Sequence, residues 1–180
     1  CPDLSISDVP ELVQYTEQAV GAAPGGYINS GVLLMDLKKL REAGLEERFL
    51  SLLNTYHLDT IAPDQDYINA MCKGRMLYLP AEWDAMPGPG EPLEHPCLVH
   101  YNLFSKPWCY DGIQYGDIFW QYAAQSGYAD ELRAFKAAYS DEQKRSDAAC
   151  MQRLVTRGVE ITRSDKTFRK LAESGVAVRL

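Results

Sequence analysis

The sequence predicts an α/β protein with a helical C-terminal tail, and three observations lead to this fold class. The run from Ser30 to Leu37 is too apolar for a half-exposed strand and is typical of a central strand buried on both faces. Segments with helical periodicity precede and follow this run. From Gly112 onward every patterned segment is helical. The change in pattern near residue 110 predicts two domains, residues 1–110 and 111–180.

The individual elements follow from capping residues and breakers. A helix is expected to begin near Pro10, after the cap candidates Ser5 and Ser7, and to end in the Gly- and Pro-containing stretch 21–26. Asp64 opens another helix, which stops at Gly74. The other expected helices are 38–42, 45–53, 116–125, 130–139, 141–157 and 166–173. Two short strands are expected at residues 75–79 and 96–99.

Composition and charge exclude some classes of protein. The chain has 180 residues, enough for a substantial core, and a formal net charge of −7, which argues against a nucleic-acid partner. No transmembrane segment is expected, because no apolar run approaches the ~20 residues of a membrane span. The five cysteines are odd in number and lack a CxxC pair, which favours reduced thiols in a cytosolic setting. Because the chain begins with Cys1 and has no initiator methionine, we expect a piece of a longer protein.

The segment from His100 to Trp108 is the first candidate site. A neutral imidazole can bind a divalent cation, and the Lys106 ammonium can lie against phosphate oxygens held by that cation. His100 can equally be a structural hydrogen-bonding residue at the end of a strand. Trp108 is expected to be a packing anchor rather than a stacking platform. The other histidines, His57 and His95, are expected at the surface.

Two further segments carry polar residues that allow two interpretations. Asp64-Gln65-Asp66 has the form of a metal-binding DxD motif, but Asp64 after Pro63 can also be a helix cap. Asn29, followed by Ser30 and a glycine, can contact ligand hydroxyls or simply form a turn. A phosphohydrolase using Asp64 and Asp66 would need more carboxylates than this region offers. No GxSxG, GxGxxG or Walker A motif is present.

Taken in order, three segments resemble one family. They are residues 27–41, 64–69 and 100–108, and Leu77–Pro80 with Trp83 fits a fourth conserved segment. The resemblance is to the retaining, metal-dependent glycosyltransferases of family eight, which include glycogenin and bacterial lipopolysaccharide galactosyl- and glucosyltransferases. It covers about residues 27–125. Leu103 stands where the family often has glycine.

The resemblance implies a partial GT-A fold, Rossmann-like and lacking its N-terminal strands. It implies a hexosyltransferase that uses a UDP-sugar, Mn²⁺ or Mg²⁺ and a saccharide acceptor in lipopolysaccharide or other cell-surface glycan synthesis. The implied location is the cytoplasm, including the inner membrane surface. Donor sugar, acceptor, linkage and oligomeric state are not specified by the sequence.

The resemblance also implies roles for individual residues. His100 would be a metal ligand, and Lys106 would contact the donor diphosphate. The donor-sugar residues would be Asn29, Asp64 and Gln65, with Gln65 near the anomeric carbon in the catalytic position. Asp66 and Asn69 would support the helix that begins at Asp64.

The family's metal-binding DxD lies upstream of the segment that begins at Tyr27, and nothing in residues 1–26 matches it. We therefore expect the C-terminal half of a transferase, which is inactive alone because one imidazole holds Mn²⁺ poorly without carboxylates. The alternative is a non-catalytic interaction module derived from such an enzyme. Exposure of Phe119, Trp120 and Tyr122 on one helix would favour that alternative.

Overall fold

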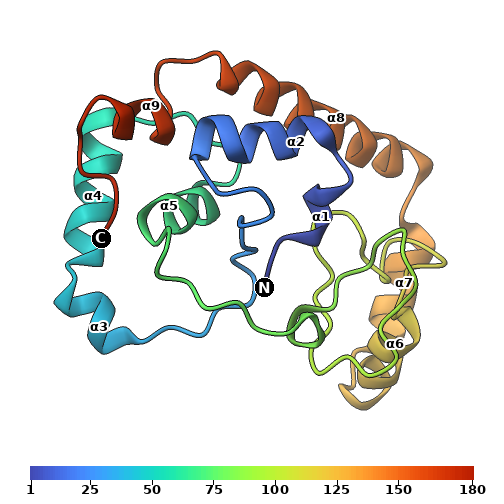
Figure 1. Cartoon of the computed structure of the whole chain (residues 1–180). Coiled ribbons are helices and arrows are strands. Elements are labelled where there is room, and N and C mark those ends of the chain that lie inside the picture. The colour runs from blue at the N-terminus through green and yellow to red at the C-terminus, as the bar shows by residue number, and fades with distance from the viewer. The chain divides into compact units, whose positions relative to one another are not determined.

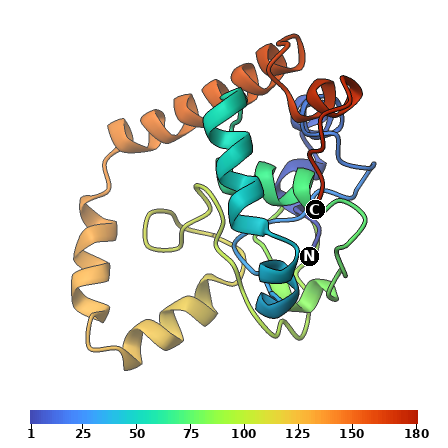
Figure 2. The ribbon, with the colours of Figure 1, turned by 90° about the vertical axis from the view of Figure 1, so that its left-hand side faces the viewer.

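The structure, a computed structural model, describes residues 1–180 apart from the side chain of Leu4. Helices are the main regular elements (Figures 1 and 2), and β-pairing among the described residues is limited to two isolated bridges, Pro2 with Ile28 and Ala85 with Val99. The chain forms two compact units: unit 1 is Cys1–Leu79 with Arg153–Leu180, and unit 2 is Pro80–Gln152. These limits differ from the predicted division near residue 110, which stays a prediction.

The segments predicted as strands are not strands in this structure. Residues 30–36 have no regular structure, and Leu34 is 88% exposed. In the other two segments Leu77 is 90% exposed and Leu98 is 38% exposed. A strand needs a neighbour for its backbone donors and acceptors, and among the described residues only the bridge at Val99 supplies one. The α/β prediction and its partial GT-A form are therefore not confirmed.

Unit 1 contains most of the helices. They are α1 (Leu4–Ser7), α2 (Pro10–Tyr15), the π-helical turn η1 (Thr16–Val20), α3 (Leu37–Glu42), α4 (Leu45–Tyr56), α5 (Pro63–Met71) and α9 (Phe168–Glu173). Helix α8 (Asp141–Thr162) contains the boundary between the units. Its C-terminal part runs beside α2 (Figure 1), where a Cβ at Gly158 would stand 3.4 Å from Leu12 Cδ2. Glycine thus permits close helix packing.

The core of unit 1 centres on Tyr67. Its ring meets those of Phe49 and Phe168 edge-on, with centroids 4.8 Å and 4.7 Å away. Such edge-to-face pairs add to the free energy gained by burying the rings. The core therefore joins α4 and α5, which follow one another in the sequence, to α9 near the C-terminus, and these contacts hold α5 in place.

The start of α5 differs from the prediction. Its N-cap is Ala62 and Pro63 takes the first helical position, so the interpretation of Asp64 as the cap is wrong. Asp66, a turn further on, accepts hydrogen bonds from the Ala62 and Ile61 backbone N–H groups at 3.1 Å and 3.3 Å. These are the N–H groups of the N-cap residue and of the residue before it, so Asp66 reaches back as the helical residue of a capping box does.

Unit 2 contains η2 (Ala81–Asp84), α6 (Gly116–Gln125), α7 (Ala129–Ala138) and the N-terminal part of α8. The chain between η2 and α6 is irregular, as its green-to-yellow course in Figure 2 shows. Trp108 packs against Phe119 and Tyr101 with ring centroids 4.8 Å and 6.1 Å away, which confirms its role as a packing anchor. The predicted helices after Gly112 are also confirmed, with shifts of a few residues.

None of the five cysteines is in a disulfide; Cys1 and Cys109 are buried, whereas Cys97 is exposed. In the part of the chain that the structure describes, no helix combines the length and the apolar character needed to cross a membrane.

Candidate functional site

Asp3 is the centre of a polar cluster in unit 1. It is 6% exposed, and its Oδ2 accepts hydrogen bonds from the side-chain amides of Asn29 at 3.1 Å and Gln65 at 2.8 Å. The bridge between Pro2 and Ile28 sets this arrangement, because the Asp3 N–H donates to the Tyr27 carbonyl oxygen at 2.8 Å. Two of the predicted donor-sugar residues, from separate parts of the sequence, therefore meet at one carboxylate.

Ser30 joins Asp64 to the same cluster. Its backbone N–H donates to Gln65 Oε1 at 2.8 Å, and its hydroxyl donates to Asp64 Oδ2 at 2.8 Å. The Gly31 N–H donates to Asn29 Oδ1 at 2.7 Å, so this segment is also a turn. Asp64 is exposed and Gln65 half-buried, whereas Asn29 is only 3% exposed. Asp64 and Gln65 can therefore face a ligand, whereas buried Asn29 is hydrogen-bonded to Asp3 and Gly31.

Asp66 and Asn69 support α5, as expected. Asp66 is 0% exposed and accepts the hydroxyls of Tyr15 at 2.7 Å and Tyr27 at 2.6 Å. Burial raises the pKa of the Asp66 carboxyl above its usual range, and the hydrogen bonds that it accepts oppose this shift. The Asn69 side chain accepts the Ile28 N–H at 2.8 Å and donates to the Ile28 carbonyl oxygen at 2.9 Å. These contacts tie the helix to the turn that carries Asn29.

His100 lies in unit 2, next to the parallel bridge between Ala85 and Val99. The Ala85 N–H donates to the Leu98 carbonyl oxygen, and the His100 N–H donates to the Ala85 carbonyl oxygen, both at 2.9 Å. This pairing brings His100 Nδ1 to 3.1 Å from Asp84 Oδ1. The Asp84 side chain is 0% exposed and that of His100 is 24% exposed. The Nδ1 atom of His100 therefore faces the buried Asp84 carboxylate, while solvent still reaches the imidazole ring.

Lys106 is engaged within its own loop. Its ammonium donates to the Tyr101 carbonyl oxygen and stands 5.4 Å from the centroid of the Trp108 ring, a cation–π distance. Burial lowers the pKa of the Lys106 ammonium. To bind a phosphate, the Lys106 ammonium would replace its hydrogen bond to the Tyr101 carbonyl oxygen with one to a phosphate oxygen. Leu103 in the same loop has φ +44°, a left-handed conformation that glycine adopts more easily.

The donor set for a divalent metal is incomplete. A histidine whose second nitrogen faces a carboxylate is a usual metal ligand, so His100 fits this role. Among the described residues, however, no group of three His, Cys, Asp or Glu side chains is placed to hold a metal ion. Mn²⁺ and Mg²⁺ require several oxygen ligands. Asn29, Asp64 and Gln65 belong to unit 1, whereas His100 and Lys106 belong to unit 2.

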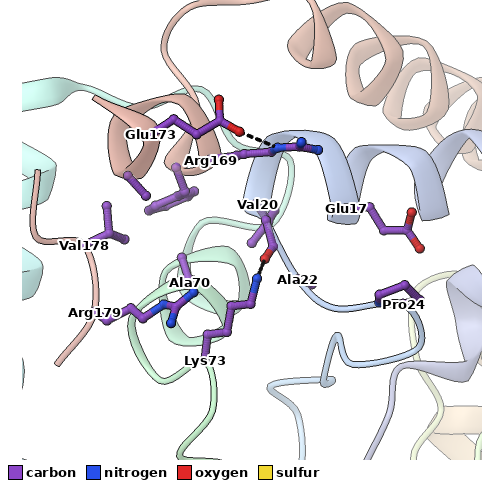
Figure 3. A pocket seen from close by; sticks show the side chains of 13 residues that line it. Glu17, Val20, Ala22, Pro24, Ala70, Lys73, Arg169, Glu173, Val178 and Arg179 are labelled. Atoms are coloured by element: carbon purple, nitrogen blue, oxygen red, sulfur yellow. Dashed lines mark hydrogen bonds and ion pairs between the residues drawn. The ribbon is translucent and has the colours of Figure 1, made fainter. Parts of the chain in front are cut away.

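A cavity of about 500 Å³ lies elsewhere on unit 1, and none of the predicted site residues lines it (Figure 3). Apolar side chains such as Val20 and Val178 line part of it. Of its charged groups, the Lys73 ammonium donates to the Gly21 carbonyl oxygen, and Arg169 Nε pairs with Glu173 at 2.9 Å. Because none of the predicted site residues lines it, the cavity is a weaker candidate than the Asp3 cluster.

The comparisons with known proteins agree with the resemblance. The family profile described as glycosyl transferase family 8 matches residues 5–112, more than half of the chain. The chain belongs to this family. No solved structure matches it.

Two curated relatives are similar over shorter stretches. The lipopolysaccharide 1,2-glucosyltransferase of Escherichia coli (strain K12) is 36% identical over an alignment of 97 positions, which covers 47% of this chain and 29% of that protein. A Haemophilus influenzae protein, provisionally assigned as a glycosyltransferase, is 29% identical over 63 residues, or 35% of this chain and 19% of that protein. The chain thus spans less than a third of the length of either relative.

Sequence reasoning missed two carboxylates. Asp3 lies in residues 1–26, where no DxD motif matches, and Asp84 belongs to none of the candidate sites. Each reaches its partners through an isolated bridge between distant segments, which leaves no local pattern in the sequence. Only the close spacing of Asp3 and Ser5 signals a local cap, since the Ser5 N–H donates to Asp3 Oδ1 at 3.0 Å.

Proposed function

We propose that this chain is part of a metal-dependent retaining glycosyltransferase, which transfers a hexose from a UDP-sugar to a saccharide acceptor in lipopolysaccharide or other cell-surface glycan synthesis. Membership of the family supports the class of enzyme, and the Escherichia coli relative supports the kind of product. The observation that carries the proposal is the convergence of Asn29, Asp64 and Gln65 around Asp3 and Ser30.

This cluster suits the recognition of a sugar. Amide and carboxylate side chains that are hydrogen-bonded to one another keep fixed orientations. Their remaining donors and acceptors can therefore match sugar hydroxyls without further loss of side-chain freedom. Asp64, exposed on the first turn of α5, is placed for this contact. Gln65 is proposed near the anomeric carbon, where its side-chain oxygen would face the positive charge that develops as the bond to the leaving group breaks.

The proposed fold contains strands that this structure does not have. We propose that residues 1–110 are the C-terminal part of a GT-A domain and that residues 111–180 are a helical extension. Support comes from exposed apolar side chains in the segments that lack partners, namely Leu34 at 88% and Leu77 at 90% exposure. Pairing of these segments as strands in a complete sheet would bury this surface.

His100 and Lys106 are proposed to act on the diphosphate side of the donor. His100 would supply one ligand to Mn²⁺ or Mg²⁺, and the bound cation would neutralise charge on the leaving diphosphate. Lys106 would bind the same diphosphate directly. Because the other metal ligands are absent from the described clusters, the 180-residue chain alone is proposed to be inactive. A cytoplasmic location at the inner membrane surface is part of the proposal.

The proposal is tested in a full-length family 8 transferase that carries this sequence. Gln65→Ala is expected to lower kcat for UDP-hexose turnover by about 100-fold. The matched control is Gln125→Ala, at the exposed end of α6, which should leave kcat unchanged. Equal activity of both variants would remove Gln65 from the catalytic site. Unchanged Mn²⁺ dependence in His100→Ala would remove the metal-ligand role.

The second candidate is a non-catalytic interaction module, and one observation favours it. In the α6–α7 region Tyr122, Tyr128 and Phe135 are 70%, 62% and 49% exposed, although Phe119 and Trp120 are partly buried. Exposed aromatic residues are common at docking surfaces. If the full-length protein turns over no UDP-hexose while Tyr122→Ser abolishes a binding interaction, the module is the better description.

A further inference from the structure

We propose that Asp84 is a positioning residue, which holds His100 with its hydrogen on Nδ1 and so leaves the lone pair of Nε2 as the electron-pair donor. This tautomer is a property of the imidazole alone. The use of Nε2 to bind a metal rests on the proposed function of His100. Asp84 has no role in the sequence-based prediction, and none of the comparisons assigns it one.

The backbone fixes the two side chains relative to each other. Residues 82–85 and 97–100 are joined by four backbone hydrogen bonds: Cys97 and Leu98 N–H to the Glu82 carbonyl oxygen, Ala85 N–H to Leu98, and His100 N–H to Ala85, at 2.7 to 3.0 Å. Asp84 and His100 lie within these two segments. Backbone pairing therefore places the two side chains side by side. The distance between His100 Nδ1 and Asp84 Oδ1 is 3.1 Å.

The chemistry of the pair determines where the hydrogen lies. We take Asp84 to be ionised as part of the proposal. An ionised carboxylate has no hydrogen to donate, so Nδ1 then carries the hydrogen of this bond, whether the imidazole is neutral or protonated. A free neutral imidazole in water prefers its hydrogen on Nε2, which is the opposite arrangement. The side chain of Asp84 is 0% exposed, so water does not compete for this carboxylate as it would at the surface.

The consequence is an imidazole prepared to act through Nε2. A carboxylate that accepts the Nδ1 hydrogen fixes both the tautomer and the orientation of the ring and makes the other nitrogen a stronger donor of electrons. The His100 side chain is 24% exposed, so the ring is reachable from outside. His95 offers the contrast within the same chain. It stands 3.8 Å from Glu94, but both side chains are almost fully exposed, at 88% and 89%.

The inference is tested by ¹⁵N NMR of the imidazoles in the 180-residue chain, at about pH 8, where an ordinary histidine is neutral. The three histidines are few enough to assign with a His100→Gln variant. Long-range ¹H–¹⁵N correlations distinguish a protonated from an unprotonated ring nitrogen. We expect His100 to show a protonated Nδ1 and an unprotonated Nε2. We expect His57 and His95 to show the mixture typical of free imidazole.

Two variants complete the test. Asp84→Ala should shift His100 to the Nε2–H form, whereas Asp84→Asn, which keeps an acceptor oxygen in the same place, should retain much of the Nδ1–H form. Glu94→Gln is the matched control and should leave all three imidazoles unchanged. An Nε2–H tautomer in the unmodified chain overturns the proposal, even if Asp84→Ala fails to fold. An unchanged tautomer in a folded Asp84→Ala variant overturns it as well.

A separate measurement distinguishes this inference from the proposed function. In a full-length transferase that carries this sequence, free Mn²⁺ is measured by electron paramagnetic resonance. Loss of Asp84 should weaken Mn²⁺ binding by about 10- to 100-fold, the usual effect of removing a carboxylate behind a metal-binding histidine. If the tautomer is as expected but His100→Gln does not weaken Mn²⁺ binding, the positioning role stands and the metal role of His100 fails.

Discussion

Each of the two units contains a carboxylate that accepts two tyrosine hydroxyls, but only one of these carboxylates is fully buried. In unit 1, Asp66 is 0% exposed and receives one hydroxyl on each oxygen, from Tyr15 and Tyr27. In unit 2, half-buried Asp147 receives both hydroxyls on Oδ2, from Tyr110 and Tyr139, each at 2.6 Å. The polar contacts are alike, and their surroundings are not.

Burial and the number of hydrogen bonds both raise the value of such a group, and Asp66 has more of each than Asp147. Asp66 also accepts two backbone N–H groups at the start of α5, and water does not reach its carboxylate, which is 0% exposed. Water can reach Asp147 and take over part of its role. We therefore expect unit 1 to depend on its carboxylate far more than unit 2 depends on Asp147.

The largest effect is expected for Asp66→Ala. It leaves two tyrosine hydroxyls and the Ala62 N–H without their acceptor, whereas the Ile61 N–H keeps the Tyr15 hydroxyl at 3.2 Å. The substitution should lower the free energy of unfolding by about 3–4 kcal/mol. Urea unfolding followed by circular dichroism measures the loss. Asp64→Ala, two residues away, removes one exposed bond to Ser30 and should cost less than about 1 kcal/mol. Equal losses for the two variants would show that burial does not decide the value.

The second prediction concerns pH. Burial raises the pKa of Asp66 in the folded chain above its value in the unfolded chain. The proton that the folded chain binds at Asp66 therefore stabilises the fold in full below the unfolded pKa, and this stabilisation is lost as pH rises through the folded pKa. The Asp66→Asn variant has no carboxyl at this position to titrate. Lowering the pH from about 8 to about 5 should therefore stabilise the unmodified chain relative to Asp66→Asn. A change in the opposite direction would mean that the four donors outweigh burial and lower the pKa.

The sequence predicted the helices better than the sheet. Helical periodicity reflects contacts between residues three and four apart, so the segments that became α6, α7 and α8 could be identified locally. The apolar run after Ser30 showed which residues would be buried in a sheet, but a strand also needs partner strands, and the described residues do not provide them.

The candidate site was predicted in the same uneven way. The resemblance named Asn29, Asp64 and Gln65, and the structure brings these three together. It did not name Asp3 or Asp84, because each contact depends on a bridge between segments that local spacing does not connect. Buried carboxylates that orient other side chains carry no signature in a single sequence.

Asp147→Asn tests unit 2. The pKa of Tyr110 is raised to about 12, first by desolvation and then by its hydrogen bond to Asp147 and the charge of that carboxylate. The substitution removes the charge but leaves the desolvation, so the pKa of Tyr110 should fall without reaching the ordinary value of about 10. Ultraviolet titration of tyrosinate measures this shift. The free energy of unfolding should fall by only about 1 kcal/mol, and a loss as large as that of Asp66→Ala would remove the distinction between the two units.

The smallest effect is expected at the backbone, where the two units should behave alike. Leu103 in unit 2 and His57 in unit 1 both have left-handed conformations, with φ +44° and +47°, and both are exposed. In this region the Cβ of a non-glycine residue is strained, and little burial is lost on its removal. Leu103→Gly and His57→Gly should therefore each raise the free energy of unfolding by about 0.5–1 kcal/mol, measured by urea unfolding. A loss of stability at Leu103 alone would show that its side chain holds the loop between His100 and Lys106 in place. The left-handed turn would then be part of the proposed diphosphate site rather than a strain that glycine relieves.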